Sequence, residues 1–171
     1  MCGIVGITSS NEVTTRIISS LKKLEYRGYD SAGIATLSNG NINEVKCEGR
    51  VDALEKNIIQ TNISGSIGIG HVRWATHGKP STINAHPHSS EEVSVVHNGI
   101  IENSTLLKKT LEQKGYKFKS QTDTEVIVHL VTEYLKENNL KDTIIKVLKK
   151  LHGSFALGII FKDQPDLIVG A

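Results

Sequence analysis

The segment "MCGIVGIT" (1–8) places a cysteine directly behind the initiator methionine and continues as a short, unbroken apolar run. A run of this length predicts a buried β-strand. Cys2 is then either a small apolar residue that fills the strand or a nucleophile at its start. Trimming of Met1 would leave Cys2 with a free α-amine, which titrates close to neutral pH and can serve as general base for its own thiol. Position alone leaves both interpretations open.

The composition is that of one globular domain with a real hydrophobic core. The 171 residues are 38% apolar and 22% charged, which excludes a disordered or membrane-spanning chain, and no signal peptide is recognised. Charges alternate in sign around a net charge of +2, so we expect neither nucleic-acid nor membrane binding. We expect a cytoplasmic protein with reduced thiols and no disulfide between Cys2 and Cys47.

Strand pairs alternate with helix pairs along the chain. The apolar periodicity predicts helices over 11–24, about 51–60, 103–115, 122–138 and about 142–151, with strands over 2–8, 33–38, 43–48, 66–74, 93–97, 154–161 and 166–171. A Ser/Asn cluster is expected to cap the first helix, and Thr122 and Glu125 form a capping box for the fourth. The segment "YRGYDSAG" (26–33) predicts a loop, "NGN" (39–41) predicts a hairpin turn, and the glycines of "SIGIGHVRW" (66–74) predict close packing against a neighbouring layer. Hairpins outnumber parallel crossovers, so we expect an α+β fold of largely antiparallel sheets covered by helices.

The segment "GHVRWATHG" (70–78) holds an arginine where a strand leaves the sheet. The guanidinium of Arg73 can hold a carboxylate through two parallel hydrogen bonds. A structural ion pair is the alternative, and the segment alone favours it.

Two further segments carry polar groups of ambiguous role. In "VVHNGIIEN" (95–103), Asn98 and Gly99 predict a turn that closes the strand, and an amide beside a glycine N–H can also form an oxyanion hole. In "SQTDTE" (120–125), Asp123 begins a helix, where it is either a cap or an acceptor for a substrate ammonium.

Five of the seven histidines fall between positions 71 and 97. They are His71, His77, His86, His88 and His97. Their spacing matches no metal-binding helix motif, and neither cysteine is close in sequence, so no metal site is predicted. The sequence assigns His71, His86, His88 and His97 no role.

Taken together, six ordered motifs resemble the class II glutamine amidotransferases. They are "MCGIVGI" (1–7), "LEYRGYDSAG" (24–33), "GHVRWATHG" (70–78), "NAHPH" (84–88), "VVHNGIIEN" (95–103) and "TDTEVI" (122–127). Within that class, "RWATHG" and "NAHPH" resemble the glutaminase domain of the isomerizing glutamine–fructose-6-phosphate aminotransferases. The sister amidophosphoribosyltransferases, which usually differ at these two motifs, are the alternative.

The resemblance implies a four-layer αββα N-terminal-nucleophile hydrolase fold and hydrolysis of L-glutamine without metal or organic cofactor. Cys2 matches the nucleophile, and Asn98 and Gly99 match the oxyanion hole. Further residues match the glutamine pocket, its gate and a supporting loop: Arg73 for the α-carboxylate, Asp123 for the α-ammonium, Thr76 and His77 for the lining, Trp74 for the ammonia exit and Arg27 for the ordering of the terminal cysteine.

The resemblance also implies a longer parent enzyme. Full-length relatives continue into sugar isomerase domains that bind fructose 6-phosphate and are expected to form a homodimer. The present chain is expected to be a glutaminase domain truncated at its C-terminus, with the isomerase domains absent. A non-catalytic glutamine-binding module and a thiol-dependent amidase for another amide stay open as alternatives.

Overall fold

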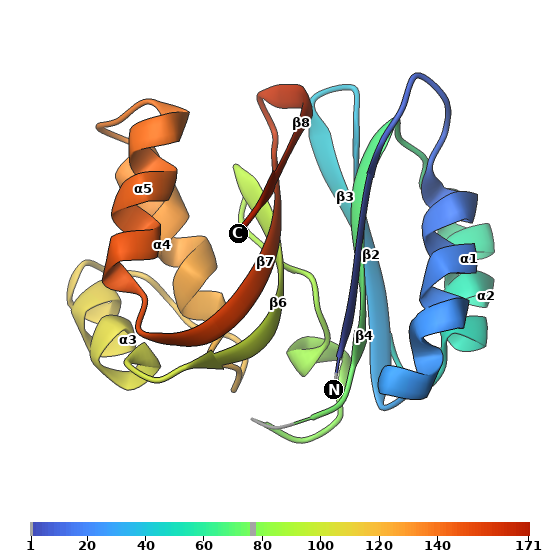
Figure 1. The fold of residues 1–171 in the computed structure, drawn as a ribbon, viewed down its shortest axis with the longest axis horizontal. Coiled ribbons are helices and arrows are strands. Elements are labelled where there is room, and N and C mark those ends of the chain that lie inside the picture. The colour runs from blue at the N-terminus through green and yellow to red at the C-terminus, as the bar shows by residue number, and fades with distance from the viewer. Residues whose placement is uncertain (1, 76–77) are drawn as a thin grey trace.

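The computed structural model describes residues 2–75 and 78–171 and arranges them in four layers (Figure 1). Two sheets pack face to face, and helices cover the outer face of each. This architecture confirms the predicted αββα sandwich, and both sheets are antiparallel throughout. Among the described residues, no helix is long and apolar enough to cross a membrane.

The first sheet and its two helices are formed by the N-terminal half of the chain. Its strands follow the order β1-β4-β2-β3, with β1 Gly3–Thr8, β2 Ser31–Ser38, β3 Asn41–Glu48 and β4 Ile67–Arg73. Helices α1 (Thr14–Leu24) and α2 (Val51–Thr61) lie on its outer face. The glycines of β4 allow α1 to pack closely, as predicted, because a Cβ added to Gly70 would lie 2.6 Å from the Ile17 side chain.

The second sheet and its three helices are formed by the C-terminal half. Its strands follow the order β5-β6-β7-β8, with β5 His88–Ser89, β6 Val93–Ile101, β7 Gly153–Phe161 and β8 Gln164–Gly170. The outer face is covered by α3 (Ser104–Gln113), α4 (Glu125–Leu135) and α5 (Leu140–Lys150). Apolar residues of the three helices form one buried cluster with β6 and β7.

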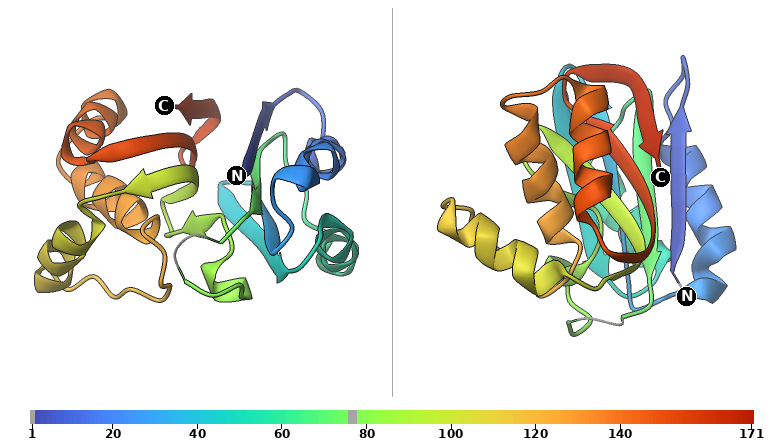
Figure 2. Two further views of the ribbon diagram at one scale, coloured as in Figure 1. Left: turned by 60° about the horizontal axis from the view of Figure 1, so that its bottom comes forward. Right: turned by 60° about the vertical axis from the view of Figure 1, so that its left-hand side comes forward.

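The two sheets share a small apolar cluster that fixes their relative position. It contains the side chains of Ala35, Leu37, Ile67, Ile69, Val96 and Ile160. The edge strands β1 and β8 also lie side by side, with Ile168 of β8 3.5 Å from where a Cβ of Gly6 would be (Figure 2). The end of this sandwich at which β1 begins and β4 ends holds the candidate site.

Several predicted boundaries were wrong. Strand β2 begins at Ser31, inside the segment expected to be a loop, because its backbone pairs with both β3 and β4. Helix α1 begins at Thr14, and the carboxylate of Glu12, rather than a Ser/Asn cluster, accepts its first N–H. The predicted hairpin turn is confirmed, since Asn39 and Gly40 adopt φ values of 51° and 71°.

Candidate active site

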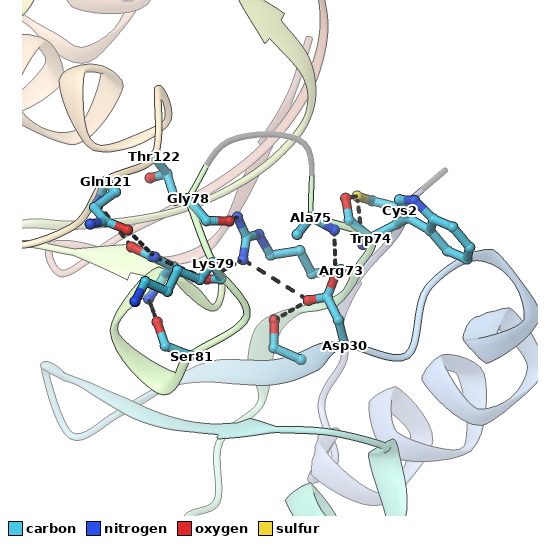
Figure 3. A network of polar contacts seen from close by, with 12 residues as sticks. Cys2, Asp30, Arg73, Trp74, Ala75, Gly78, Lys79, Ser81, Gln121 and Thr122 are labelled. Atoms are coloured by element: carbon cyan, nitrogen blue, oxygen red, sulfur yellow. Dashed lines mark hydrogen bonds and ion pairs between the residues drawn. The ribbon is translucent and has the colours of Figure 1, made fainter.

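Cys2 lies immediately before β1, at the open end of the sandwich. Because β1 pairs with β4, the cysteine comes to rest beside Trp74, which follows the last residue of β4. The Trp74 backbone N–H donates to Cys2 Sγ at 3.2 Å, and the thiol donates to the Trp74 carbonyl at 3.5 Å (Figure 3). The cysteine is partly exposed. Its sulfur is therefore held by backbone groups and still accessible to a small molecule.

The carbonyl of Cys2 is held by two side chains from different parts of the fold. Arg27, in the short helix η1 (Glu25–Arg27), donates Nε–H at 3.0 Å. Asn98, in β6, donates Nδ2–H at 3.2 Å. A residue of η1 and a residue of the second sheet therefore fix the position of the terminal cysteine.

Arg73 is buried, with 4% of its surface exposed, at the end of β4. Its guanidinium donates to the carbonyls of Gly78 and Lys79 at 3.3 and 3.4 Å, and its Nη1 lies 4.0 Å from an oxygen of Asp30 (Figure 3). A 4.0 Å separation is long for a charge-assisted hydrogen bond. The predicted structural ion pair is thus loose, and the guanidinium is oriented largely by backbone carbonyls.

Asp123 is not a helix cap, because α4 begins later, at Glu125. Its Oδ2 accepts the backbone N–H of Ile101 at 2.7 Å, where β6 ends. The carboxylate is thereby fixed at the edge of the second sheet. It lines the same hollow as Cys2 and Arg73.

The predicted capping box was also wrong. The Thr122 hydroxyl bonds to Ser120 and His88 instead of an N–H of the helix, and Glu125 accepts backbone N–H groups of Lys119 and Ser120. Burial raises the pKa of Glu125, but the neighbouring His129 ring, 3.6 Å away, and hydrogen bonds from this loop outweigh it and lower the pKa to about 2. The charged carboxylate folds the preceding loop, which carries Asp123, against α4.

Two hollows meet at Cys2. The narrow one encloses about 20 Å³, room for about one water molecule. It is lined by Cys2, Arg73, Trp74, His86, His97, Gly99, Thr122, Asp123 and Thr124. The wider one, of about 460 Å³, is lined by Cys2, Arg27, Trp74, Asn98, Gly99, Ile100, Ser154, Phe155 and Ala156. Cys2, Trp74 and Gly99 line both, so a ligand at the sulfur can place charged groups on one side and an apolar or uncharged part on the other.

Asn98 and Gly99 do not form a turn, which corrects the sequence prediction. They lie within β6 and pair with Ala156 and Phe155 of β7. Gly99 has φ of 120°, and a Cβ there would lie 2.1 Å from the Ser154 carbonyl oxygen. Only glycine fits this position, and it brings the β6 backbone close to the neighbouring strand beside Cys2.

Four histidines form a buried cluster between the sheets, although they are far apart in sequence. The His71 ring stacks on the His86 ring, with the two ring centroids 4.3 Å apart. The His88 ring lies edge-on to the His86 ring, with the centroids 4.9 Å apart. Thr124 Oγ1 lies 2.8 Å from both His86 Nε2 and His97 Nδ1. Burial lowers the pKa of His71 to about 4 and that of His88 to about 3, and it also lowers the pKa of His86 well below its usual value. The rings of His71, His86 and His88 are therefore neutral at pH 7.

Three further observations concern residues that the sequence analysis named. Within the described part of the chain, no group of His, Cys, Asp or Glu residues has the geometry of a metal site. Cys47, in β3, is a free thiol buried against α2, where burial raises its pKa. Thr76 and His77 lie outside the described residues.

Asp30 is a site residue that the sequence analysis did not single out. Its carboxylate accepts the backbone N–H of Ala75 and the hydroxyl of Ser31, besides facing Arg73 (Figure 3). It therefore fixes the path of the chain as it leaves β4 past Cys2. The only signal was its place within the motif "LEYRGYDSAG" (24–33).

Comparisons with known proteins show the family of the chain. A family model described as a glutamine amidotransferase domain matches residues 72–170. A curated glutamine–fructose-6-phosphate aminotransferase (isomerizing) from Clostridium acetobutylicum is 55% identical over 99% of this chain and 28% of its own length. The protein of the same name from Caldanaerobacter subterraneus is 51% identical over 100% of this chain and 28% of its own length. The chain thus spans about 28% of the length of these relatives.

A solved structure gives the same picture of the fold. The glutamine phosphoribosylpyrophosphate amidotransferase from B. subtilis, complexed with ADP and GMP, superposes with a TM-score of 0.82 at 30% identity. The match covers 95% of this chain and 35% of the amidotransferase. The sandwich fold is therefore shared with a protein that bears the amidotransferase name.

Proposed function

The chain belongs to the glutamine amidotransferase domain family, and we propose that it hydrolyses the side-chain amide of L-glutamine through a thioester on Cys2. The main support for this proposal is that charged side chains and an amide donor lie around one cysteine sulfur. The Cys2 thiol lies in a hollow that also holds Arg73 and Asp123, and the Asn98 amide points at the same residue. Charged groups for an amino acid and a donor for an oxyanion therefore surround a single nucleophile.

In the proposed reaction, the thiol of Cys2 transfers its proton to the Cys2 α-amine and the sulfur attacks the glutamine Cδ. The amide oxygen becomes an oxyanion, which the Asn98 side chain and the Gly99 backbone N–H would stabilise. Collapse of the adduct breaks the C–N bond, and the α-ammonium returns the proton to the leaving ammonia. Water then attacks the thioester, releases glutamate and regenerates the thiol. This sequence requires that Met1 be removed, because an acylated nitrogen is not a base.

Arg73 and Asp123 would recognise the amino-acid end of the substrate. A free α-amino acid carries one negative and one positive group on the same carbon, and the narrow hollow offers one residue of each opposite sign. Its enclosed volume of about 20 Å³ is smaller than this end of glutamine, so binding must move some of the lining side chains apart. Thr76 and His77 are assigned to the same pocket by the resemblance alone.

We further propose that the chain is the glutaminase part of a longer, cytoplasmic and homodimeric enzyme. There the ammonia would react with D-fructose 6-phosphate, and loss of water with isomerisation would give D-glucosamine 6-phosphate. The naming of relatives about 50% identical over the whole chain supports this acceptor. Trp74, exposed over 47% of its surface beside Cys2, is the residue we place at the ammonia exit.

The test is a comparison of glutamate release from L-glutamine by wild type, Cys2→Ala and Cys47→Ala, in this chain and in the longer enzyme. Wild type and Cys47→Ala should release glutamate, and Cys2→Ala should not. Equal loss from both substitutions would remove the assignment of the nucleophile. A chain that binds glutamine and never releases glutamate would be a non-catalytic module. Supplying fructose 6-phosphate or phosphoribosyl pyrophosphate to the longer enzyme decides between the two acceptors.

A further inference from the structure

The buried histidine cluster contains one ring that touches the proposed oxyanion donor. His71 lies in β4 with none of its surface exposed. Its Nε2 is 2.9 Å from Asn98 Oδ1 and 3.0 Å from the His97 carbonyl oxygen. A carbonyl oxygen can only accept, so Nε2 must carry the hydrogen of the ring.

The opposite ring nitrogen agrees with this tautomer. His71 Nδ1 is buried and has no hydrogen-bond partner among the described residues, so a hydrogen there would be an unsatisfied buried donor. Burial also lowers the pKa of His71 to about 4, so the ring carries a single hydrogen at pH 7. That hydrogen is on Nε2.

The tautomer in turn fixes the orientation of the Asn98 amide. An N–H donor at His71 Nε2 requires Oδ1 of Asn98 to face it, because a flipped amide would set two donors against each other. Both hydrogens of Nδ2 then point away from His71, and one of them reaches the Cys2 carbonyl at 3.2 Å. A flipped amide would present an oxygen to the developing oxyanion and repel it.

We propose that His71 is a positioning residue of glutamine hydrolysis, which holds the Asn98 amide with its NH₂ group toward Cys2. The inference rests on the proposed function, and it adds a residue that does not touch the substrate. Neighbouring groups keep the ring in place. The backbone of His71 pairs with Ile4 of β1 and Gly33 of β2, and the ring stacks on His86.

The proposal is tested by a double-mutant cycle between His71 and Asn98, measured as glutaminase kcat and KM on the longer enzyme. Asn98→Ala should lower kcat by about 10²–10³ with little change in KM, as removal of one oxyanion donor does. His71→Met, which removes the donor at similar volume, should lower kcat by about 10-fold or more, without exceeding the loss of Asn98→Ala. His71→Gln, whose amide can place an N–H near Nε2, should retain most of the wild-type kcat.

The decisive arm is the double variant. If His71 acts through Asn98, His71→Met should change kcat by less than about twofold once Asn98 is alanine. If the kcat of the double variant fell by the product of the two single losses, the proposal would be overturned and His71 would be a purely structural residue. A wild-type kcat in His71→Met would overturn it as well. Ile69→Val, a buried truncation in the same strand, is the control for packing loss and should leave kcat unchanged.

A second measurement does not depend on activity. Nitrogen-15 NMR of the histidine side chains in the wild-type chain at pH 7 should find the His71 hydrogen on Nε2, with coupling across the bond to Asn98. A hydrogen on Nδ1 would overturn the proposal. If wild type released no glutamate, the proposed function would fail, and the NMR result would still decide whether His71 orients the Asn98 amide.

Discussion

Asn98 shows how one side chain links the two sheets at the site. Its amide accepts from His71 of β4 and donates to Cys2 before β1, while its backbone belongs to β6. The motifs of the sequence predicted that Asn98, Cys2, Arg73 and Asp123 belong to one site, and the structure brings them together around Cys2. The contact of His71 with Asn98 could not be predicted, because it joins residues of different sheets and depends on how those sheets are stacked.

Charge recognition by Arg73 and Asp123 predicts how glutamine derivatives are discriminated. Blocking the α-amine or amidating the α-carboxylate leaves a charged side chain without its substrate partner, which costs about 1.5–3 kcal/mol, or about 10- to 150-fold in kcat/KM. N-acetylglutamine and glutamine α-amide should both be poor substrates. Asp123→Asn should reduce the difference in kcat/KM between glutamine and N-acetylglutamine. Arg73→Gln should reduce the difference between glutamine and glutamine α-amide.

The measurement is kcat/KM for the three compounds on wild type and both variants. Asn at position 123 can still accept the Ile101 N–H, so its loop should keep its structure. Asp52→Asn, which alters an exposed ion pair with Lys22, is the matched control, because neither residue lines either hollow. If wild type hydrolysed the blocked amides as well as glutamine, the chain would be an amidase of broader specificity.

Strand β6 is the element that sequence reasoning described least well. Asn-Gly after an apolar run predicts a turn because both residues tolerate positive φ. Gly99 does adopt a positive φ, but the strand continues through it to Ile101 because β7 supplies partners on this edge. Local propensity correctly predicted the positive φ of Gly99. Pairing with β7 determined that the segment is a strand and not a turn. The helices, the 39–40 hairpin and the antiparallel sheets needed no such information and were predicted.

Gly99 and Gly40 provide a direct test of this pairing. Both have positive φ, but a Cβ meets the Ser154 carbonyl at 2.1 Å only at Gly99 and meets nothing within 4 Å at Gly40. Gly40→Ala should cost about 1 kcal/mol and lower Tm by about 2–4 °C. Gly99→Ala adds a backbone clash and should lower Tm by roughly twice that or more. Equal shifts in calorimetry would contradict the close approach of β6 and β7.

Several neutral histidines are buried between the two sheets of the molecule. His71, His86 and His88 bind protons far less readily in the folded protein than in the unfolded chain, where the pKa is about 6.5. The unfolded state therefore binds more protons as pH falls below about 6.5. The stability that these residues contribute is complete above that pH and is lost toward pH 4 and 3.

Urea unfolding between pH 7 and pH 5 should therefore show a steep loss of stability. Each neutral histidine contributes up to about 1.4 kcal/mol per pH unit in this window. His88→Gln should reduce the slope by up to that amount, whereas His152→Gln at an exposed position should leave the slope as in wild type. A stability that is flat from pH 7 to pH 5 would contradict the neutral, buried cluster.

The proposed reaction passes through a γ-glutamyl thioester on Cys2, which acid-quenched peptide mapping of the enzyme during turnover of L-glutamine can detect. Acid protonates the α-amine and preserves the thioester against transfer to nitrogen. We expect a peptide that begins at Cys2, lacks Met1 and carries one glutamyl group on sulfur, in wild type and Cys47→Ala alike. Sustained glutamate release by a chain that retains Met1, or from an enzyme whose glutamyl group is on another residue, would contradict it.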